Sequence, residues 1–161
     1  MEEGKKYRIF ATILALLAFA LDQWSKAEIL SELSLLQHAA MGVTNFFNVV
    51  LVFNSGVSFG MFAGQNQPLI LTIISGIIIC ILLVWLQKTH SRMVATGIGL
   101  VVGGAVGNVW DRVRYGAVVD FLDFHWEGLH WPAFNLADSF VFIGVCLLCI
   151  HSIFFDNKKP E

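Results

Sequence analysis

The sequence predicts a mainly α-helical protein that crosses a membrane four times, and its composition is the first reason. Apolar residues make up 57% of the 161 residues and charged residues only 14%. An average soluble domain has about 45–50% apolar and about 25% charged residues. The second reason is that four stretches without internal charge approach the roughly 20 residues that a helix needs to span the hydrocarbon core. A polytopic membrane protein is therefore expected.

The first predicted span covers Ile9–Leu21 and extends to about residue 25 if Asp22 faces protein or water at the membrane boundary. Basic residues precede it, as in a secretory signal peptide, but no A-x-A-like cleavage site follows, so we interpret it as an uncleaved anchor. The other spans are expected at about 68–87, 93–110 and 138–155. Glycines recur through the third of the four spans, where we expect a close-packing helix surface. No linker divides the chain, which predicts one integral-membrane domain over residues 1–161.

The predicted orientation follows from the basic residues, because these are retained on the cytoplasmic side in short loops. Four crossings place seven of the ten Lys and Arg residues on one side of the membrane. These seven are Lys5, Lys6, Arg8, Lys88, Arg92, Lys158 and Lys159. Both termini are therefore expected to be cytoplasmic, while acidic residues gather at the extracytoplasmic side.

The segment between Glu32 and Lys88 has no formal charge, which leaves room for a fifth span around Phe46–Phe62. Polar residues and glycine interrupt that stretch, and a fifth crossing would put Lys88 opposite the N-terminal basic cluster. We therefore expect four spans. Phe46–Phe53 is rich in Val and Phe, and the Asn54-Ser55-Gly56 run that follows is typical of a turn. A short β-hairpin on the extracytoplasmic surface is predicted.

Four aspartates, Asp22, Asp111, Asp120 and Asp138, fall at the ends of predicted spans or between them. Ionisable groups next to membrane spans are costly and are retained mainly where they act. A structural role is open for each one singly: Asp138 suits the first turn of a helix, and Asp111 beside Arg112 suits an interfacial ion pair. Their convergence at one depth favours a functional site.

Asp120 and Asp138 form the best pair for chemistry. Two carboxylates within hydrogen-bond reach share a proton, because both cannot ionise cheaply. One then activates a water as general base, while the protonated one polarises the scissile carbonyl of a peptide. Asp123 competes with Asp120 for this role. The two lie three positions apart, so in an extended strand they would face opposite ways.

Other classes of site have less support. Cys146 and Cys149 are three positions apart without a completing ligand set, and Cys80 stands alone, so no metal is expected. The chain contains neither a P-loop nor a dinucleotide-binding glycine motif, so no cofactor is expected. A net charge of −2 offers no basic face for nucleic acid.

Five short blocks then occur in order along the chain. They are Asp22-Gln23-x-x-Lys26, Phe53-Asn54-x-Gly56-x-x-Phe59-Gly60, Gly107-Asn108-x-x-Asp111-Arg112, Val119-Asp120-Phe121 and Phe134-Asn135-x-Ala137-Asp138. In this order and topology, the chain resembles the bacterial lipoprotein signal peptidases, also called signal peptidase II, over nearly its whole length. One departure is Val57-Ser58, where family members often have two alanines; we expect it to tune packing only.

The resemblance implies an aspartic endopeptidase of the bacterial cytoplasmic (inner) membrane with its active site at the extracytoplasmic face. Such enzymes remove the signal peptide from diacylglyceryl-modified prolipoproteins by cutting just before the lipidated cysteine. The family's catalytic dyad falls on Asp120 and Asp138. Residues implied to bind substrate or support the site are Asp22, Lys26, Asn54, Gly56, Asn108, Asp111, Arg112, Asn135 and Ala137. Membrane lipids and a globomycin-type inhibitor are the other implied partners, and a monomer is expected.

Two alternatives remain open from the sequence. A transporter or proton-conducting subunit also uses intramembrane carboxylates, but it predicts charges spread through the membrane depth or inverted repeats. Another type of intramembrane aspartyl protease would carry a G-x-G-D signature, which this chain lacks. Within the favoured site, Arg112 or Arg114 is expected to hold a carbonyl or a lipid phosphate.

Overall fold

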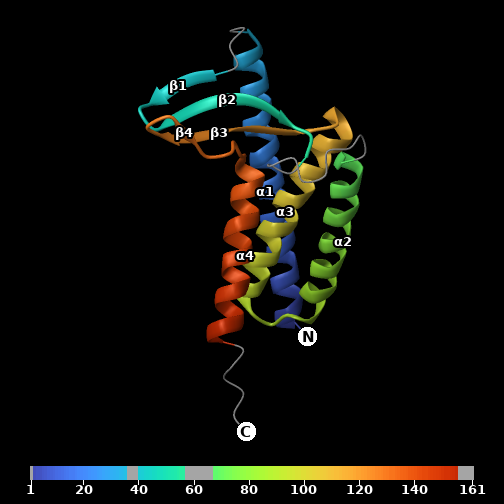
Figure 1. The fold of residues 1–161 in the computed structure, drawn as a ribbon. Helices are drawn as coiled ribbons and strands as arrows, with labels where there is room; N and C mark the ends of the chain where they lie inside the picture. The colour runs from blue at the N-terminus through green and yellow to red at the C-terminus, as the bar shows by residue number, and fades with distance from the viewer. Residues whose placement is uncertain (1, 36–39, 57–66, 156–161) are drawn as a thin grey trace.

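The computed structural model describes residues 2–35, 40–56 and 67–155, and it has four long helices below a small antiparallel sheet (Figure 1). The elements are α1 Glu2–Leu35, β1 Ala40–Thr44, β2 Phe47–Asn54, α2 Gln67–Lys88, α3 Arg92–Tyr115, β3 Val118–Trp126, β4 Leu129–His130 and α4 Leu136–Phe154. Within the described ranges, four helices are long and apolar enough to cross a membrane. The predicted mainly α, four-span fold is therefore confirmed.

Helix α1 is longer than the span predicted within it. It runs without interruption from Glu2 to Leu35, 34 residues in all. At 1.5 Å per residue it is about 50 Å long, whereas the hydrocarbon core is about 30 Å thick. Its far end extends beyond the level of the sheet (Figure 1). Asp22 and Lys26 therefore lie in the interior of a continuous helix rather than in a loop after it.

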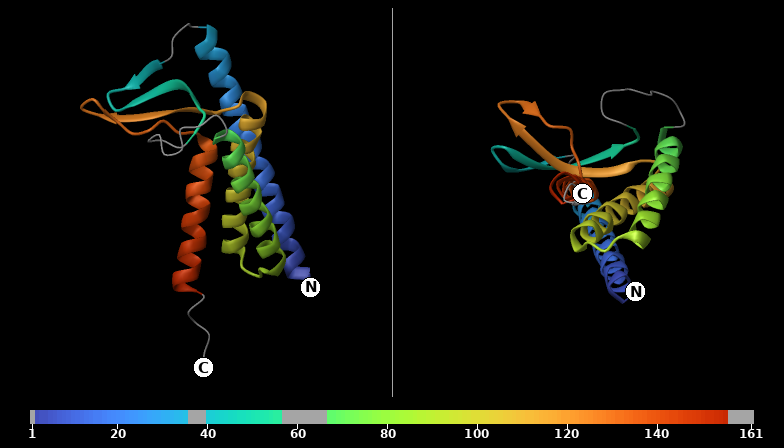
Figure 2. Two further views of the ribbon diagram at one scale, coloured as in Figure 1. Left: turned by 45° about the vertical axis from the view of Figure 1, so that its right-hand side comes forward. Right: turned by 90° about the horizontal axis from the view of Figure 1, so that it is seen from below.

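Helix α3 packs against the other three helices, and its glycines face α1 and α4 (Figures 1 and 2). A Cβ built on Gly97 would lie 2.9 Å from the Gly144 carbonyl oxygen of α4. A Cβ on Gly99 would lie 2.8 Å from the Ala11 carbonyl oxygen of α1. Such close backbone approach is the usual way for helices to associate where lipid removes the hydrophobic drive between them. The close-packing surface predicted for the third span is confirmed.

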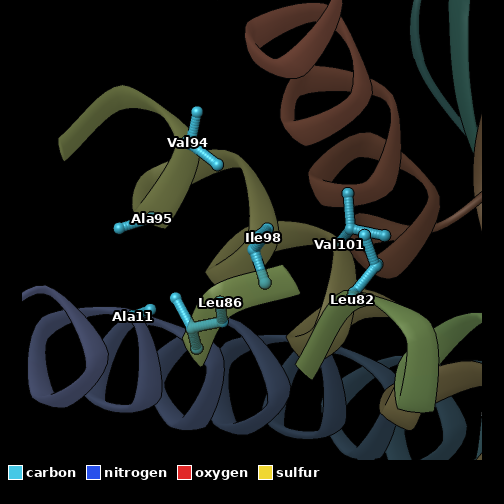
Figure 3. Close-up of a cluster of buried hydrophobic side chains, with 7 residues drawn as sticks. All are labelled: Ala11, Leu82, Leu86, Val94, Ala95, Ile98 and Val101. Carbon is cyan, nitrogen blue, oxygen red and sulfur yellow. The ribbon is translucent and has the colours of Figure 1, made fainter. Parts of the chain in front are cut away.

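The apolar core lies between α1, α2 and α3 (Figure 3). Its buried members are Ala11, Leu82, Leu86, Val94, Ala95, Ile98 and Val101. The outer face of α2 is different, because large residues such as Ile77 and Ile81 are more than half exposed. In a membrane this face contacts lipid chains rather than water. The bundle therefore needs only a narrow core.

The sheet has the order β1-β2-β3-β4 with all pairs antiparallel. It projects to one side of the bundle, at the end away from the start of α1 (Figure 2). β2 pairs with β3 from Phe47 opposite Phe124 to Asn54 opposite Val118, with a shift of register between Val49 and Val52. This pairing anchors the hairpin to the segment that follows α3.

A hairpin is present at this end of the bundle, and it reverses at Asn45-Phe46, between β1 and β2. The predicted strand Phe46–Phe53 corresponds to β2, which ends at Asn54. Asn54 Oδ1 then accepts a hydrogen bond from the Gly56 backbone N–H at 3.1 Å, a local contact that is typical of an asparagine turn. The rest of the predicted hairpin, Val57–Phe62, lies outside the described residues.

Replacing Gly104 by Ala is expected to destabilise the bundle, because the new Cβ would collide with the Ala137 carbonyl oxygen of α4. Overpacking of this kind costs about 1–3 kcal/mol. Gly76→Ala on α2 is the matched control, since nothing lies within 4 Å of its Cβ position. Unfolding of the detergent-solubilised protein would measure the difference. Equal stability of the two variants would contradict the packing argument.

Candidate functional site

A cluster of buried polar side chains lies where the sheet meets the helices. Its members come from α1, β2, α3, β3 and the start of α4. Five of them are at most 2% exposed: Asp22, Lys26, Asp111, Asp120 and Asn135. Charges this deeply buried are costly unless they are paired and hydrogen-bonded. The partners of each group therefore describe how the site is built.

Lys26 is the cation of the cluster. Its Nζ atom lies 2.8 Å from Asp22 Oδ2 and 2.8 Å from Asp111 Oδ2. Asp22 is one turn before Lys26 on α1, whereas Asp111 belongs to α3. Lys26 Nζ also donates a hydrogen bond to Asn108 Oδ1 at 3.2 Å. One ammonium group thus joins two carboxylates and links the two helices.

Gln23 takes part in the same network; it belongs to the Asp22-Gln23-x-x-Lys26 block but was not among the predicted site residues. Its Nε2 atom donates to Asp22 Oδ2 at 3.1 Å and to Asp111 Oδ1 at 3.0 Å. Its place three positions before Lys26, on the same helix face, is the sequence signal that would have indicated it. Gly107 makes room for this arrangement, because a Cβ there would collide with Asp22 Oδ2.

The two carboxylates held by Lys26 also fix backbone outside the helix pair. Asp22 Oδ1 accepts a hydrogen bond from the Ala137 backbone N–H at 3.0 Å. Asp111 Oδ2 accepts one from the Val119 backbone N–H at 3.2 Å. Ala137 directly precedes Asp138, and Val119 directly precedes Asp120. The network therefore positions the chain on which both predicted catalytic aspartates lie.

Asp120 lies on β3 between two amide side chains. Its Oδ1 accepts from Asn135 Nδ2 at 2.7 Å, and its Oδ2 accepts from Asn54 Nδ2 at 2.9 Å. Burial raises the pKa of Asp120 to about 6; the Asn54 hydrogen bond opposes the shift, and the nearby charge of Asp138 adds to it. Asp120 therefore keeps a proton to an unusually high pH for a carboxyl group.

Asp138 is in the first turn of α4, and Asn135 is the residue that caps this helix. Asn135 Oδ1 accepts from the Asp138 backbone N–H at 2.9 Å, and Asp138 Oδ2 accepts from the Asn135 backbone N–H at 3.3 Å. Asp138 Oδ1 also accepts from Asn108 Nδ2 at 2.8 Å. This is a capping box, a common helix start. Asn135 thus contacts both Asp120 and Asp138.

The remaining predicted residues lie at the edge of this network. The Gly56 backbone N–H donates to Asn54 Oδ1 at 3.1 Å, which holds the amide that contacts Asp120. Arg112 Nη1 donates to the Asn108 carbonyl oxygen at 3.3 Å, while its buried Nε has no hydrogen-bond partner among the described residues. Arg114 instead stacks on the Tyr115 ring, 5.1 Å from its centroid, and is exposed.

Asp123 lies apart from the cluster, as strand alternation predicts. It accepts from Asn48 Nδ2 at 2.8 Å, and its Oδ1 lies 2.9 Å from His130 Nδ1. Burial by itself would raise the pKa of Asp123, but the hydrogen bonds from His130 and Asn48 outweigh burial and the pKa is lowered. Across residues 2–35, 40–56 and 67–155, no group of three His, Cys, Asp or Glu side chains is placed to hold a metal ion.

Known proteins of one family are similar to this chain. A family model described as Signal peptidase (SPase) II matches residues 14–154. The lipoprotein signal peptidase of Aeromonas hydrophila is 43% identical over 150 residues, which cover 91% of this chain and 89% of that protein. That of Alteromonas mediterranea is 41% identical over 152 residues, which cover 92% of this chain and 82% of that protein.

Solved structures agree with the sequence comparison. One bacterial membrane enzyme, determined by the in meso method, matches this chain with a TM-score of 0.78 and 30% sequence identity. The match covers 91% of this chain and 94% of that one. A second such structure matches with a TM-score of 0.76 and 30% identity, and the match covers 94% of this chain and 93% of that one. The likeness therefore extends from the sequence to the whole fold.

Replacing Lys26 by Met is expected to destabilise the protein by about 3–5 kcal/mol, because it leaves two buried carboxylates without their cation. Lys6→Met is the matched control, since Lys6 is an exposed lysine of the same helix. The free energy of unfolding in detergent would be compared for the two variants. If Lys26→Met were as stable as Lys6→Met, the ion pairs would not support the fold.

The raised pKa of Asp120 predicts how stability depends on pH. The folded state keeps a proton that the unfolded chain releases above its ordinary pKa of 3.8, so parent stability falls as pH rises from about 4 to about 6. Asp120→Asn removes this loss, and its stability relative to the parent is expected to increase over that range by up to about 3 kcal/mol. Denaturant titrations at several pH values would measure it.

Asp123→Asn is the control with the opposite sign. Because the pKa of Asp123 is lowered in the folded state, the ionised Asp123 stabilises the folded parent at pH values above the ordinary pKa of 3.8. That stabilisation is lost as the pH falls through the lowered pKa. Asp123→Asn should therefore lose stability relative to the parent as the pH rises through this acidic range. The same trend in both variants would rule out these opposite shifts.

Proposed function

Because this chain belongs to the signal peptidase II family, the lipoprotein signal peptidases, we propose that it cleaves lipoprotein signal peptides with a water activated between Asp120 and Asp138. The observation that carries this proposal is that one residue, Asn135, hydrogen-bonds to both carboxyl groups. The charge of Asp138 also contributes to the raised pKa of Asp120, as in catalytic aspartate pairs, where one carboxyl group keeps its proton beside the other.

In the proposed reaction Asp120 is the acid and Asp138 the base. The raised pKa of Asp120 supports its role as the proton donor. Asp138 is better suited to carry negative charge, because it lies in the first turn of α4 and accepts hydrogen bonds from Asn108 and Asn135. Asp138 takes a proton from water as the water attacks the scissile carbonyl, and Asp120 gives its proton to the carbonyl oxygen.

The intermediate formed in this way is tetrahedral and is bonded to no enzyme group. Its collapse breaks the carbon–nitrogen bond, and the proton held by Asp138 passes to the leaving amine. One hydroxyl proton of the intermediate returns to Asp120. The dyad then has its starting protonation, and the products are a signal peptide with a free carboxyl end and a lipoprotein with a free amine.

Arg112 is the best candidate to bind the substrate beside the dyad. Its guanidinium group interacts electrostatically with Asp138, Asp120 and Asp111. Its buried Nε atom has no partner within the described part of the chain, and a buried donor of this kind is normally satisfied by a ligand or by water. We propose that this N–H donates to a substrate carbonyl or a lipid phosphate oxygen. Arg114 is less suited, since it is exposed.

The orientation of the bundle in the membrane supports a membrane-anchored substrate. We propose that both termini lie in the cytoplasm, because the described basic residues Lys5, Lys6, Arg8, Lys88 and Arg92 are all at the end of the bundle away from the sheet. The dyad then lies at the extracytoplasmic face of the bacterial cytoplasmic membrane. A substrate held by its acyl chains and apolar signal helix arrives laterally at this depth.

Within this setting the proposed substrate is a diacylglyceryl-modified prolipoprotein, cut just before its lipidated cysteine. Acyl chains on the cysteine fix that residue at the membrane boundary, which brings the neighbouring bond to the level of the dyad. A cyclic-peptide inhibitor of the globomycin type is proposed to bind the same site. A single copy of the chain contains all of the proposed residues, so a monomer suffices.

The test is cleavage of a diacylglyceryl-modified prolipoprotein by the purified protein in detergent, followed by gel shift. Asp120→Asn and Asp138→Asn are each expected to lower the rate by more than about 100-fold, since each removes one of the two proton-transfer groups. Asp123→Asn is the control and should cleave within a few-fold of the parent, because Asp123 lies outside the cluster. A folded Asp138→Asn variant with parental activity would overturn the assignment.

A further inference from the structure

The end of the bundle opposite the sheet has a polar hollow that the proposed reaction does not use. It has a volume of about 320 Å³ and lies between the end of α2, the start of α3 and the end of α4. Its lining includes Trp85, Lys88, Thr89, His90, Ser91 and His151. The nitrogen-containing side chains in this lining come from three separate segments of the chain: Lys88 from the end of α2, His90 from the loop before α3, and His151 from α4.

The hollow carries positive charge without a balancing carboxylate. No acidic side chain is among its lining residues in the described part of the chain. The ion pairs of the described residues all lie at the sheet end, so Lys88 has no carboxylate partner among them. The His90 ring lies against Gly4 of α1, next to the Arg8 guanidinium, which adds a further cation nearby. Glu2 and Glu3, in the first turn of the same helix, are exposed and are not among the lining residues. An anion therefore complements this site.

Two hydroxyl groups in the hollow supply hydrogen-bond donors. Thr89 Oγ1 accepts from the Ser91 backbone N–H at 3.3 Å, and Ser91 Oγ accepts from the Val94 backbone N–H at 3.4 Å. Each hydroxyl still has its own hydrogen to donate. Because phosphate oxygens are acceptors, an ammonium group with two hydroxyl donors fits a phosphate better than it fits a cationic or purely apolar ligand.

The depth of the hollow indicates where that phosphate comes from. Trp85 and Lys88 are one turn apart at the end of α2, and both residue types are typical of the membrane–water boundary. Immediately before them, Ile81 and Val84 are about 60% exposed on the lipid-facing surface of the same helix. A ligand with a phosphate in the hollow and acyl chains along α2 satisfies both regions. We propose that this hollow binds the headgroup phosphate of an anionic phospholipid.

The proposal can be tested by native mass spectrometry of the full chain in mild detergent. Phosphatidylglycerol and phosphatidylcholine with identical acyl chains would be titrated separately. We expect phosphatidylglycerol to bind at least about five-fold more tightly, and Lys88→Gln to reduce its affinity by about five-fold, the usual contribution of one basic residue near an anionic lipid surface. Lys5→Gln is the matched control, because Lys5 is an exposed lysine on α1 outside the hollow.

Each outcome decides the proposal. Equal affinity for the two lipids, or equal losses in Lys88→Gln and Lys5→Gln, would overturn it. A separate arm adds inorganic phosphate; displacement of the lipid at low millimolar phosphate would show a free-phosphate site instead. His151→Gln replaces Lys88→Gln if that variant does not fold, with the same expected direction. Prolipoprotein cleavage in detergent, measured in parallel, reports that each variant is folded.

Discussion

The structure depends first on the buried ammonium group of Lys26. Asp22 and Asp111 are both fully buried, and two such carboxylates would repel each other strongly without a cation between them. Lys26 lies 2.8 Å from each. Asp22 Oδ1 accepts a hydrogen bond from the backbone N–H just before Asp138, and Asp111 Oδ2, the oxygen that also contacts Lys26, accepts one from the backbone N–H just before Asp120. The positions of Asp120 and Asp138, the proposed catalytic pair, thus depend on these buried ion pairs.

Close packing along α3 makes this balance possible. Gly107 leaves the space that the Asp22 carboxylate occupies, and Gly104 lets the α4 backbone approach at Ala137. The side chains that hydrogen-bond to the proposed catalytic pair are amides: Asn54 and Asn135 contact Asp120, and Asn108 contacts Asp138. Amide donors hold the carboxyl groups in place without the strong bias toward ionisation that a cation would bring. Asp120, whose pKa is raised to about 6, therefore keeps its proton to a higher pH than an ordinary carboxyl group.

The two ends of the bundle have different chemistry. Acidic and amide groups gather under the sheet, whereas the described basic residues lie mainly at the other end (Figure 1). Between them, α2 presents an almost wholly apolar face to lipid. The proposed cleavage and the proposed lipid binding therefore take place at opposite ends of the bundle. The ion-relay alternative predicted charges spread through the depth, which this distribution contradicts.

The four spans, their close-packed third helix and the grouping of the aspartates could be predicted from the sequence, because hydropathy, small-residue spacing and charge at span ends are local properties. Only the tertiary structure decided the rest. The β1 strand, the turn at Asn45-Phe46 and the pairing of β2 with a strand more than 60 residues later were not predicted. Gln23 belongs to the site because it donates a hydrogen bond to Asp111, 88 positions later in the chain. These features depend on hydrogen bonds between distant segments, and such bonds exist only once the helices have packed.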